Sequence, residues 1–222
     1  MADMKLVLGR WATPLSQLGE RGDFAKVIKT MNTMYADKDL TILPEKHEVF
    51  RAFRLLEPED VRVVILGMDP YPTVRESTGY AFSNPEGTVR MSKSLQKIHE
   101  TIEDTFHDGL LLDFDPTLSH WAKQGVLSLN SALTVEAGKS GSHTHIWQGF
   151  TEMLIDSLSK NLEGIHFCFW GKQAQRYAYL VDPFKHNVYS CYHPAYAVRQ
   201  REKWECDHFE KINKALKPPI KW

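Results

Sequence analysis

Four short runs of apolar residues stand out in the pattern of hydrophobic and polar positions along the chain. They lie at residues 61–67, 126–130, 165–171 and 187–193, and they are rich in β-branched and aromatic side chains. None of them shows the regular alternation of polar and apolar residues that is typical of a strand with one face in water. The pattern therefore predicts four buried β-strands.

The segments between these runs have the spacing of helices. Apolar residues recur every three or four positions at 94–106, before the second run, and at 147–162, before the third. Alternating strands and helices are typical of an α/β fold, so we expect a central four-stranded parallel sheet flanked by helices. No repeat or linker divides the sequence, which predicts a single domain over 1–222 with a helical N-terminal part at 1–57.

The composition is that of a globular protein. Hydrophobic residues make up 42% of the 222 residues and charged residues 25%, which excludes disordered and collagen-like chains. No apolar run approaches the roughly 18 residues of a membrane-spanning helix, and the first residues lack the pattern of a secretory signal. We therefore expect an intracellular, cytoplasmic protein without membrane contact.

The three cysteines are Cys168, Cys191 and Cys206. Their odd number and wide spacing predict neither a disulfide framework nor a CxxC zinc site. We expect reduced thiols, as is usual in the cytosol.

Charge is nearly balanced over the whole chain, with 27 basic and 28 acidic side chains. The C-terminal quarter differs, because residues 171–222 hold ten Lys and Arg against five Asp and Glu, a net charge of +5 against −6 for the remainder. This part is either a docking surface for a polyanion or a solvated helix face.

A polar side chain that could take part in binding or catalysis stands at the end of each predicted strand. Asp69 comes after the first run, Asn130 ends the second, Lys172 follows the third and His193 closes the fourth. Ligands of parallel α/β sheets bind beyond the carboxyl ends of the strands, so these side chains are expected around one crevice. The sequence lacks the glycine-rich and P-loop patterns of nucleotide binding, and we expect no nucleotide cofactor.

Sequence motifs accompany these strand ends in a fixed order. They are GMDPYP at 67–72, TGYAFSNP at 78–85, GVLSLNSALTV at 125–135, SHTHIWQGFT at 142–151, FWG at 169–171 and HPAYAV at 193–198. In this order the chain resembles family 1 uracil-DNA glycosylases over residues 56–216. GMDPYP, YHPA and the closing PPIKW look closer to poxvirus and other viral members, which makes the host cytoplasm or nucleus an alternative location.

The resemblance implies a reaction in which the bond between uracil and deoxyribose breaks. This leaves a cation-like sugar and a uracil anion, so the site must stabilise both charges and supply water. By resemblance, Asp69 would position the water and face the sugar, and His193 would donate a hydrogen bond to uracil O2. Without the resemblance, the alternatives are that Asp69 is a turn residue before Pro70 and that His193 is a histidine packed at a strand end.

The resemblance also assigns the recognition of the flipped base, which involves Met68, Tyr71, Phe82 and Asn130. Asn130 would accept from uracil N3–H and donate to O4, while Met68 would contribute its backbone N–H. Tyr71 would exclude the thymine methyl group, and Phe82 would stack on the ring. Otherwise Asn130 is a strand-end residue bonded to backbone, and the two aromatic residues are ordinary core.

DNA contacts are implied for Ser94, Lys172, Pro194, Ala195, Tyr196 and Arg199. Pro72 stands where the family has a histidine and lacks a donor, so Arg90, Lys93 and Lys172 are candidates to restore phosphate contacts by charge.

The residue that enters the DNA stack is different from that of cellular enzymes. Ala197 stands where they insert a leucine, and alanine is too small to fill the place of a flipped base. We expect Arg199 to take this role, with Tyr196 as the second candidate.

Together these features predict a monofunctional uracil-DNA glycosylase of base excision repair that needs no cofactor or metal and acts on single- or double-stranded DNA. No lysine occurs in the pocket motifs as a Schiff-base nucleophile. A second interpretation is a DNA-bound adaptor of a viral replication complex, which would bind a replication or processivity protein through 1–57 or the closing LKPPIKW.

A third interpretation is a metal-dependent hydrolase that uses Asp69, His143, His145 and His193. The spacing of these residues does not match a usual ligand set, and His143 and His145 are more readily loop or helix-capping residues.

Overall fold

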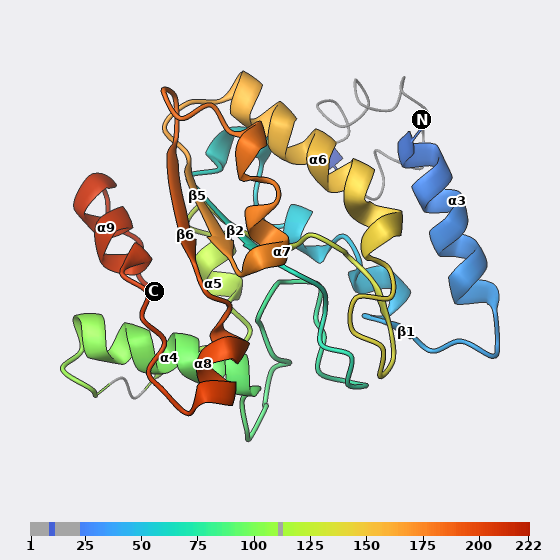
Figure 1. Cartoon of the computed structure of the whole chain (residues 1–222), viewed down its shortest axis with the longest axis horizontal. Coiled ribbons are helices and arrows are strands. Elements are labelled where there is room, and N and C mark those ends of the chain that lie inside the picture. Colours follow the sequence, from blue (N-terminus) through green and yellow to red (C-terminus); the bar gives the residue numbers. More distant parts are fainter. Residues whose placement is uncertain (1–8, 12–22, 111–112) are drawn as a thin grey trace.

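A parallel sheet of four strands forms the centre of the protein (Figure 1). The structure is a computed structural model that describes residues 9–11, 23–110 and 113–222. The strands are β2 (Val63–Gly67), β3 (Val126–Asn130), β5 (His166–Trp170) and β6 (Asn187–Cys191), in the order β3-β2-β5-β6. All three pairings are parallel, so the predicted sheet is confirmed.

Helices connect and cover these strands. The α-helices are α3 (Asp23–Ala36), α4 (Lys93–Phe106), α5 (Ser119–Ala122), α6 (Thr144–Asn161), α7 (Lys172–Gln175), α8 (Pro194–Gln200) and α9 (His208–Ala215). Short 3-10 helices lie at Gly9–Trp11, Lys46–Glu48, Arg51–Phe53, Pro58–Asp60 and Ala178–Leu180. Within the described ranges, no helix is long and apolar enough to cross a membrane.

A second, small sheet was not predicted. β1 (Ile42–Leu43) pairs antiparallel with β4 (Val135–Glu136), which follows the loop after β3. Each strand has only two residues, too few for a pattern to be visible in the sequence.

The central strands divide two hydrophobic cores, because successive side chains of a strand point to opposite faces. Val64 and Leu66 of β2 belong to the core that includes residues of α3 and α6. Val63 and Ile65 belong to the core on the other face, with residues of α4, α5 and α9. Every residue of β2, β3 and β5 is buried, as the continuous apolar runs predict.

The fourth strand differs from its prediction. β6 lies at the edge of the sheet, and Asn187, Val188 and Ser190 are exposed. The expectation of a buried strand is wrong here. β3 at the opposite edge is covered by α5 and the 3-10 helix Arg51–Phe53, whereas among the described residues the main contacts of β6 are with β5 alone.

The closing segment packs into the fold. The Trp222 ring lies 5.3 Å from that of Trp121 and 4.9 Å from that of Phe209, measured between centroids. Asn213 donates its side-chain amide to the carbonyl of Ile220 and accepts from its N–H, both at 2.9 Å. Ile220 and Trp222 are thus buried anchors, while Lys217, Pro218, Pro219 and Lys221 between and before them stay exposed.

Candidate active site

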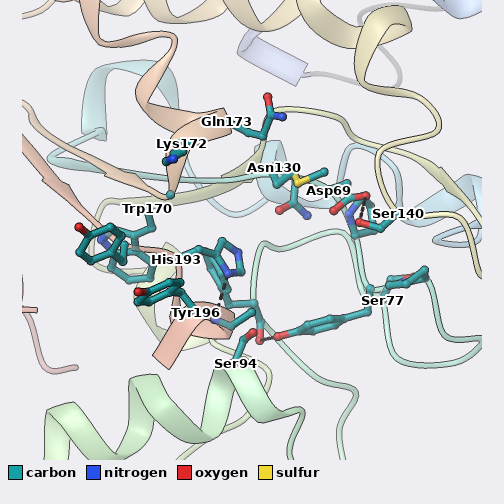
Figure 2. Close-up of a pocket in the computed structure, with 18 of the residues that line it drawn as sticks. Asp69, Ser77, Ser94, Asn130, Ser140, Trp170, Lys172, Gln173, His193 and Tyr196 are labelled. Carbon is teal, nitrogen blue, oxygen red and sulfur yellow. Dashed lines mark hydrogen bonds between the residues drawn. The ribbon is translucent and has the colours of Figure 1, made fainter. Parts of the chain in front are cut away.

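A pocket of about 740 Å³ opens at the carboxyl ends of the central strands (Figure 2). Most of the predicted site residues line it, namely Met68, Asp69, Tyr71, Phe82, Ser94, Asn130, Lys172, His193, Ala195, Tyr196 and Arg199. Pro194 is buried as the first residue of α8 and does not line the pocket, and neither do Arg90 and Lys93. The strand-end argument thus places the residues together correctly.

The carboxylate of Asp69 is held by two donors from the loop after β4. Its Oδ2 accepts hydrogen bonds from Ser140 Oγ at 2.9 Å and from the Gly141 N–H at 2.6 Å. Burial raises the pKa of Asp69, and these hydrogen bonds oppose that shift by stabilising the anion. The result is an oriented carboxylate at the pocket wall, which can hold a water molecule.

His193 is placed by the start of α8, where it is the N-cap residue. Its Nδ1 accepts from the Ala195 N–H at 3.1 Å, so the neutral ring carries its proton on Nε2. Burial and, to a smaller extent, the positive charge of Arg199 together lower the pKa of His193 to about 4. At neutral pH the ring is therefore an uncharged donor in the pocket.

Asn130 ends β3 beside Gly67, the last residue of β2. A Cβ atom at Gly67 would lie 2.7 Å from Asn130 Oδ1, so only glycine leaves room for this amide. Asn130 is 7% exposed, and no residue in the described part of the chain hydrogen-bonds its side chain. A buried amide without partners is costly unless a ligand satisfies it, which disfavours the alternative of a backbone-bonded Asn.

Two aromatic residues form one wall of the pocket. Phe82 has a left-handed φ of 67°, which a non-glycine residue rarely adopts, and its ring centroid lies 5.4 Å from that of His193. Tyr71 donates its hydroxyl to the carbonyl of Phe82 at 2.9 Å and accepts from Ser92 Oγ at 2.6 Å. Burial raises the pKa of Tyr71, so the phenol stays protonated and rigidly placed.

Two cations stand at the pocket, Lys172 at the start of α7 and Arg199 on α8. Neither forms an ion pair with a residue that the structure describes. Three other basic residues of the C-terminal quarter are paired, in Lys203–Asp104, Lys211–Asp207 and Lys214–Glu210. Lys172 and Arg199 therefore bring unpaired positive charge to the pocket itself.

The α8 helix turns Ala197 away from the pocket. Ala197 is 4% exposed and belongs to the core between α4 and the sheet, so its expected place at the DNA-facing tip is wrong. Tyr196 is 39% exposed, lines the pocket and stacks on Tyr192 with 4.9 Å between ring centroids. On α8 these neighbours therefore point in different directions, Tyr196 to the pocket and Ala197 into the core.

The metal-hydrolase interpretation finds no support in the geometry. His143 is the N-cap residue of α6, and its Nδ1 is hydrogen-bonded to Thr134 Oγ1 at 2.9 Å. Among the described residues, no metal-type cluster contains Asp69, His143, His145 or His193.

Sequence reasoning missed the residues that hold the site. Ser140, Gly141 and Ser92 contact the predicted residues through loops, and no motif or periodicity marks them. Serine and glycine are common in turns, so these residue types indicate loops but not a contact with the site.

An oriented carboxylate, an unpaired amide and a neutral imidazole around an aromatic wall define an enzyme site for a planar base, in a parallel α/β fold. The family model described as the uracil DNA glycosylase superfamily matches residues 53–217. This chain belongs to that superfamily.

Curated relatives cover most of the chain. The uracil-DNA glycosylase of Campylobacter lari is 38% identical over 200 residues, which are 88% of this chain and 86% of the relative. That of Idiomarina loihiensis is 34% identical over 217 residues, which are 96% of this chain and 99% of the relative.

Solved viral structures share the whole fold. Mimivirus uracil-DNA glycosylase matches with a TM-score of 0.86 and 30% identity over 99% of this chain and 88% of its own. A single-residue variant of mimivirus UNG in complex with UGI matches with a TM-score of 0.87 and 29% identity, over 99% of this chain and 90% of its own. These matches support the resemblance to viral members.

Proposed function

We infer that this protein hydrolyses the bond between uracil and deoxyribose in DNA and leaves an abasic site, as in base excision repair. The convergence of Asp69, Asn130 and His193 in one pocket carries this conclusion. Membership of the superfamily and the names of the curated relatives support it.

The pocket receives the uracil base after the nucleotide has been flipped out of the DNA. The base stacks on Phe82, while Asn130 accepts from N3–H and donates to O4. Tyr71, fixed by Ser92 and the Phe82 carbonyl, occupies the space that the thymine methyl group would need. The free amide of Asn130 and the rigid phenol of Tyr71 thus account for selectivity against cytosine and thymine.

The reaction separates charge between the sugar and the base. The C1′–N1 bond breaks with its electron pair moving to uracil, and the Nε2–H of His193 donates to O2 as negative charge grows there. The Asp69 carboxylate faces the cation-like sugar and orients the water that attacks C1′. The water proton passes to Asp69, and no metal or cofactor takes part.

DNA is held at the rim of the pocket. Lys172 and Arg199 supply unpaired positive charge for phosphates, with Ser94 and Ala195 beside them. Arg199 and Tyr196 are the candidates to fill the place of the flipped base, because both are exposed at the pocket whereas Ala197 is buried. Single- and double-stranded DNA are both substrates.

The adaptor interpretation is not favoured, because the curated relatives are named as enzymes over nearly their full length.

The direct test uses labelled oligonucleotides that carry one uracil, cytosine or thymine, incubated with the protein in EDTA. We expect strand cleavage at uracil only, and only after alkali has opened the abasic site. Because Lys172 lines the pocket as expected for a strand-end residue, the sample without alkali also tests for lyase chemistry. An intact uracil strand after alkali would contradict the proposal.

A further inference from the structure

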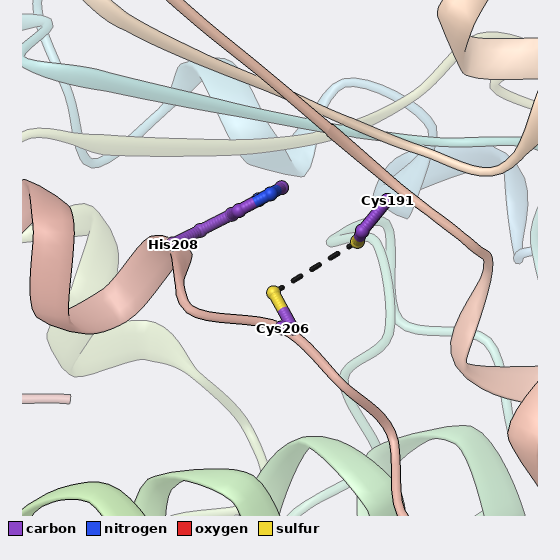
Figure 3. A group of neighbouring side chains, drawn as sticks. All are labelled: Cys191, Cys206 and His208. Carbon is purple, nitrogen blue, oxygen red and sulfur yellow. Dashed lines mark hydrogen bonds between the residues drawn. The ribbon is translucent and has the colours of Figure 1, made fainter.

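Two cysteines and a histidine, from β6 and from the segment that leads into α9, meet in space (Figure 3). Cys191 ends β6, Cys206 lies in the segment before α9, and His208 begins α9. The two sulfur atoms and a ring nitrogen of His208 all lie within 4.8 Å of one another. The spacing of the cysteines in sequence had suggested no shared site.

The separation of the two sulfur atoms fits a tetrahedral metal centre. The sulfur atoms of Cys191 and Cys206 are 3.8 Å apart. Two thiolates bound to one tetrahedral zinc ion at about 2.3 Å each are themselves separated by about 3.8 Å. A disulfide needs sulfur atoms only about 2.05 Å apart, so these side chains would have to move to form one.

We propose that Cys191, Cys206 and His208 form a binding site for one thiophilic metal ion of the Zn²⁺ type. On binding, both thiols release their protons to solvent and the ion forms bonds to two sulfur atoms and one nitrogen. The centre carries no net charge, because two thiolates balance the divalent ion, and a neutral centre is tolerated in this buried place. Cys191 is partly exposed, so a water molecule can reach the ion from this side and serve as the fourth ligand.

The surroundings hold the three ligands in place before any ion binds. Trp204 Nε1 donates to the carbonyl of Tyr192 at 2.7 Å, which ties the neighbourhood of Cys206 to that of Cys191. Trp170 Nε1 donates to His208 Nδ1 at 3.0 Å and fixes the imidazole ring. Cys206 and His208 are 8% and 4% exposed, so the side chains have little freedom.

The site is coupled to the wall of the active-site pocket through Trp170. An indole N–H can only donate, so its hydrogen bond requires a bare nitrogen at His208 Nδ1. If the ion binds Nδ1, that acceptor is occupied, and if it binds Nε2, the ring proton moves to Nδ1. In both cases Trp170 loses its partner, and Trp170 lines the pocket 5.2 Å from Phe82 between ring centroids.

The experiment is a metal titration of the reduced, metal-free protein. Equilibrium dialysis with Zn²⁺ should show one tightly bound ion, and Cd²⁺ should produce the ultraviolet charge-transfer absorption of thiolate ligands. Cys206→Ser and Cys191→Ser should each lower the affinity at least about a hundredfold, since loss of even an outer partner of a metal ligand costs about 10- to 100-fold.

Cys168→Ala is the matched control, because Cys168 is a buried cysteine of the adjacent strand outside the trio. This variant should still bind one ion. Circular dichroism of every variant verifies that it is folded. Zinc binding that is equal in wild type and in the folded Cys191→Ser/Cys206→Ser double variant would overturn the proposal, as would loss of binding in folded Cys168→Ala.

Two further measurements distinguish metal binding at this site from metal binding elsewhere and from disulfide formation. The indole N–H resonance of Trp170 should shift with one equivalent of Zn²⁺ in wild type and stay unchanged in Cys206→Ser. Samples taken during the titration are stripped of metal and denatured. Each should then show three free thiols. A fall to one thiol without bound metal would show a disulfide instead and overturn the proposal.

Discussion

The charge state of His193 can be tested by lowering the pH. In the folded protein the pKa of His193 is lowered from 6.5 to about 4, first by burial and then by Arg199. Between these values the unfolded chain binds a proton at His193 and the folded protein does not. Stability due to His193 is therefore complete above pH 6.5 and is lost as the pH falls toward 4.

The size of the effect follows from the shift. A difference of one pKa unit corresponds to about 1.36 kcal/mol, so a pKa lowered from 6.5 to about 4 contributes up to about 3 kcal/mol. This is a large fraction of the roughly 5–15 kcal/mol that stabilises a typical domain.

The assay is urea unfolding of wild type and His193→Gln at pH 7 and near pH 4. Glutamine keeps an acceptor for the Ala195 N–H but does not titrate, and other acidic groups contribute equally to both proteins. We expect wild type to lose about 2–3 kcal/mol more than the variant. Equal losses, or an imidazole that titrates near its ordinary pKa of 6.5 by NMR, would refute the assignment of a neutral His193.

The remaining predictions concern specificity, DNA and packing. Tyr71→Ala should gain thymine release and Asn130→Asp cytosine release, measured with matched oligonucleotides; unchanged base preference in the folded variants would refute the base-reading roles. Arg199→Ala should slow single-turnover release from duplex DNA much more than from single strands, and equal losses would make Arg199 a phosphate contact, leaving Tyr196→Ala as the next test of the wedge. Ala197→Leu should destabilise the protein by about 1–3 kcal/mol in urea unfolding, because it overpacks a buried position, and an unchanged midpoint would contradict its burial.

The central sheet was predictable because buried parallel strands have an unmistakable composition. Val63–Gly67 is apolar throughout, and its burial on both faces leaves no polar position to confuse the pattern. The site followed from the same argument, since Asp69, Asn130 and His193 come directly after strands whose ends meet at one edge. The roles of these residues came from family motifs and not from periodicity.

Other features depend on contacts that sequence does not display. Whether β6 is central or at the edge is decided by the order of strands in space, which a run of residues does not encode. The direction of Ala197 depends on the helical phase of a short helix that begins at Pro194. The meeting of Cys191 with Cys206 requires the chain to return past β6 before α9.

The most direct test of the account is the single-turnover rate of uracil release by wild type, Asp69→Asn and His193→Leu, on one uracil-containing oligonucleotide in EDTA. A positioned acid–base or charge-stabilising group typically contributes about a hundredfold or more. We predict that each substitution slows release by at least about that factor, while uracil-containing DNA still binds. Release at the wild-type rate by both folded variants would show that this pocket does not perform the reaction.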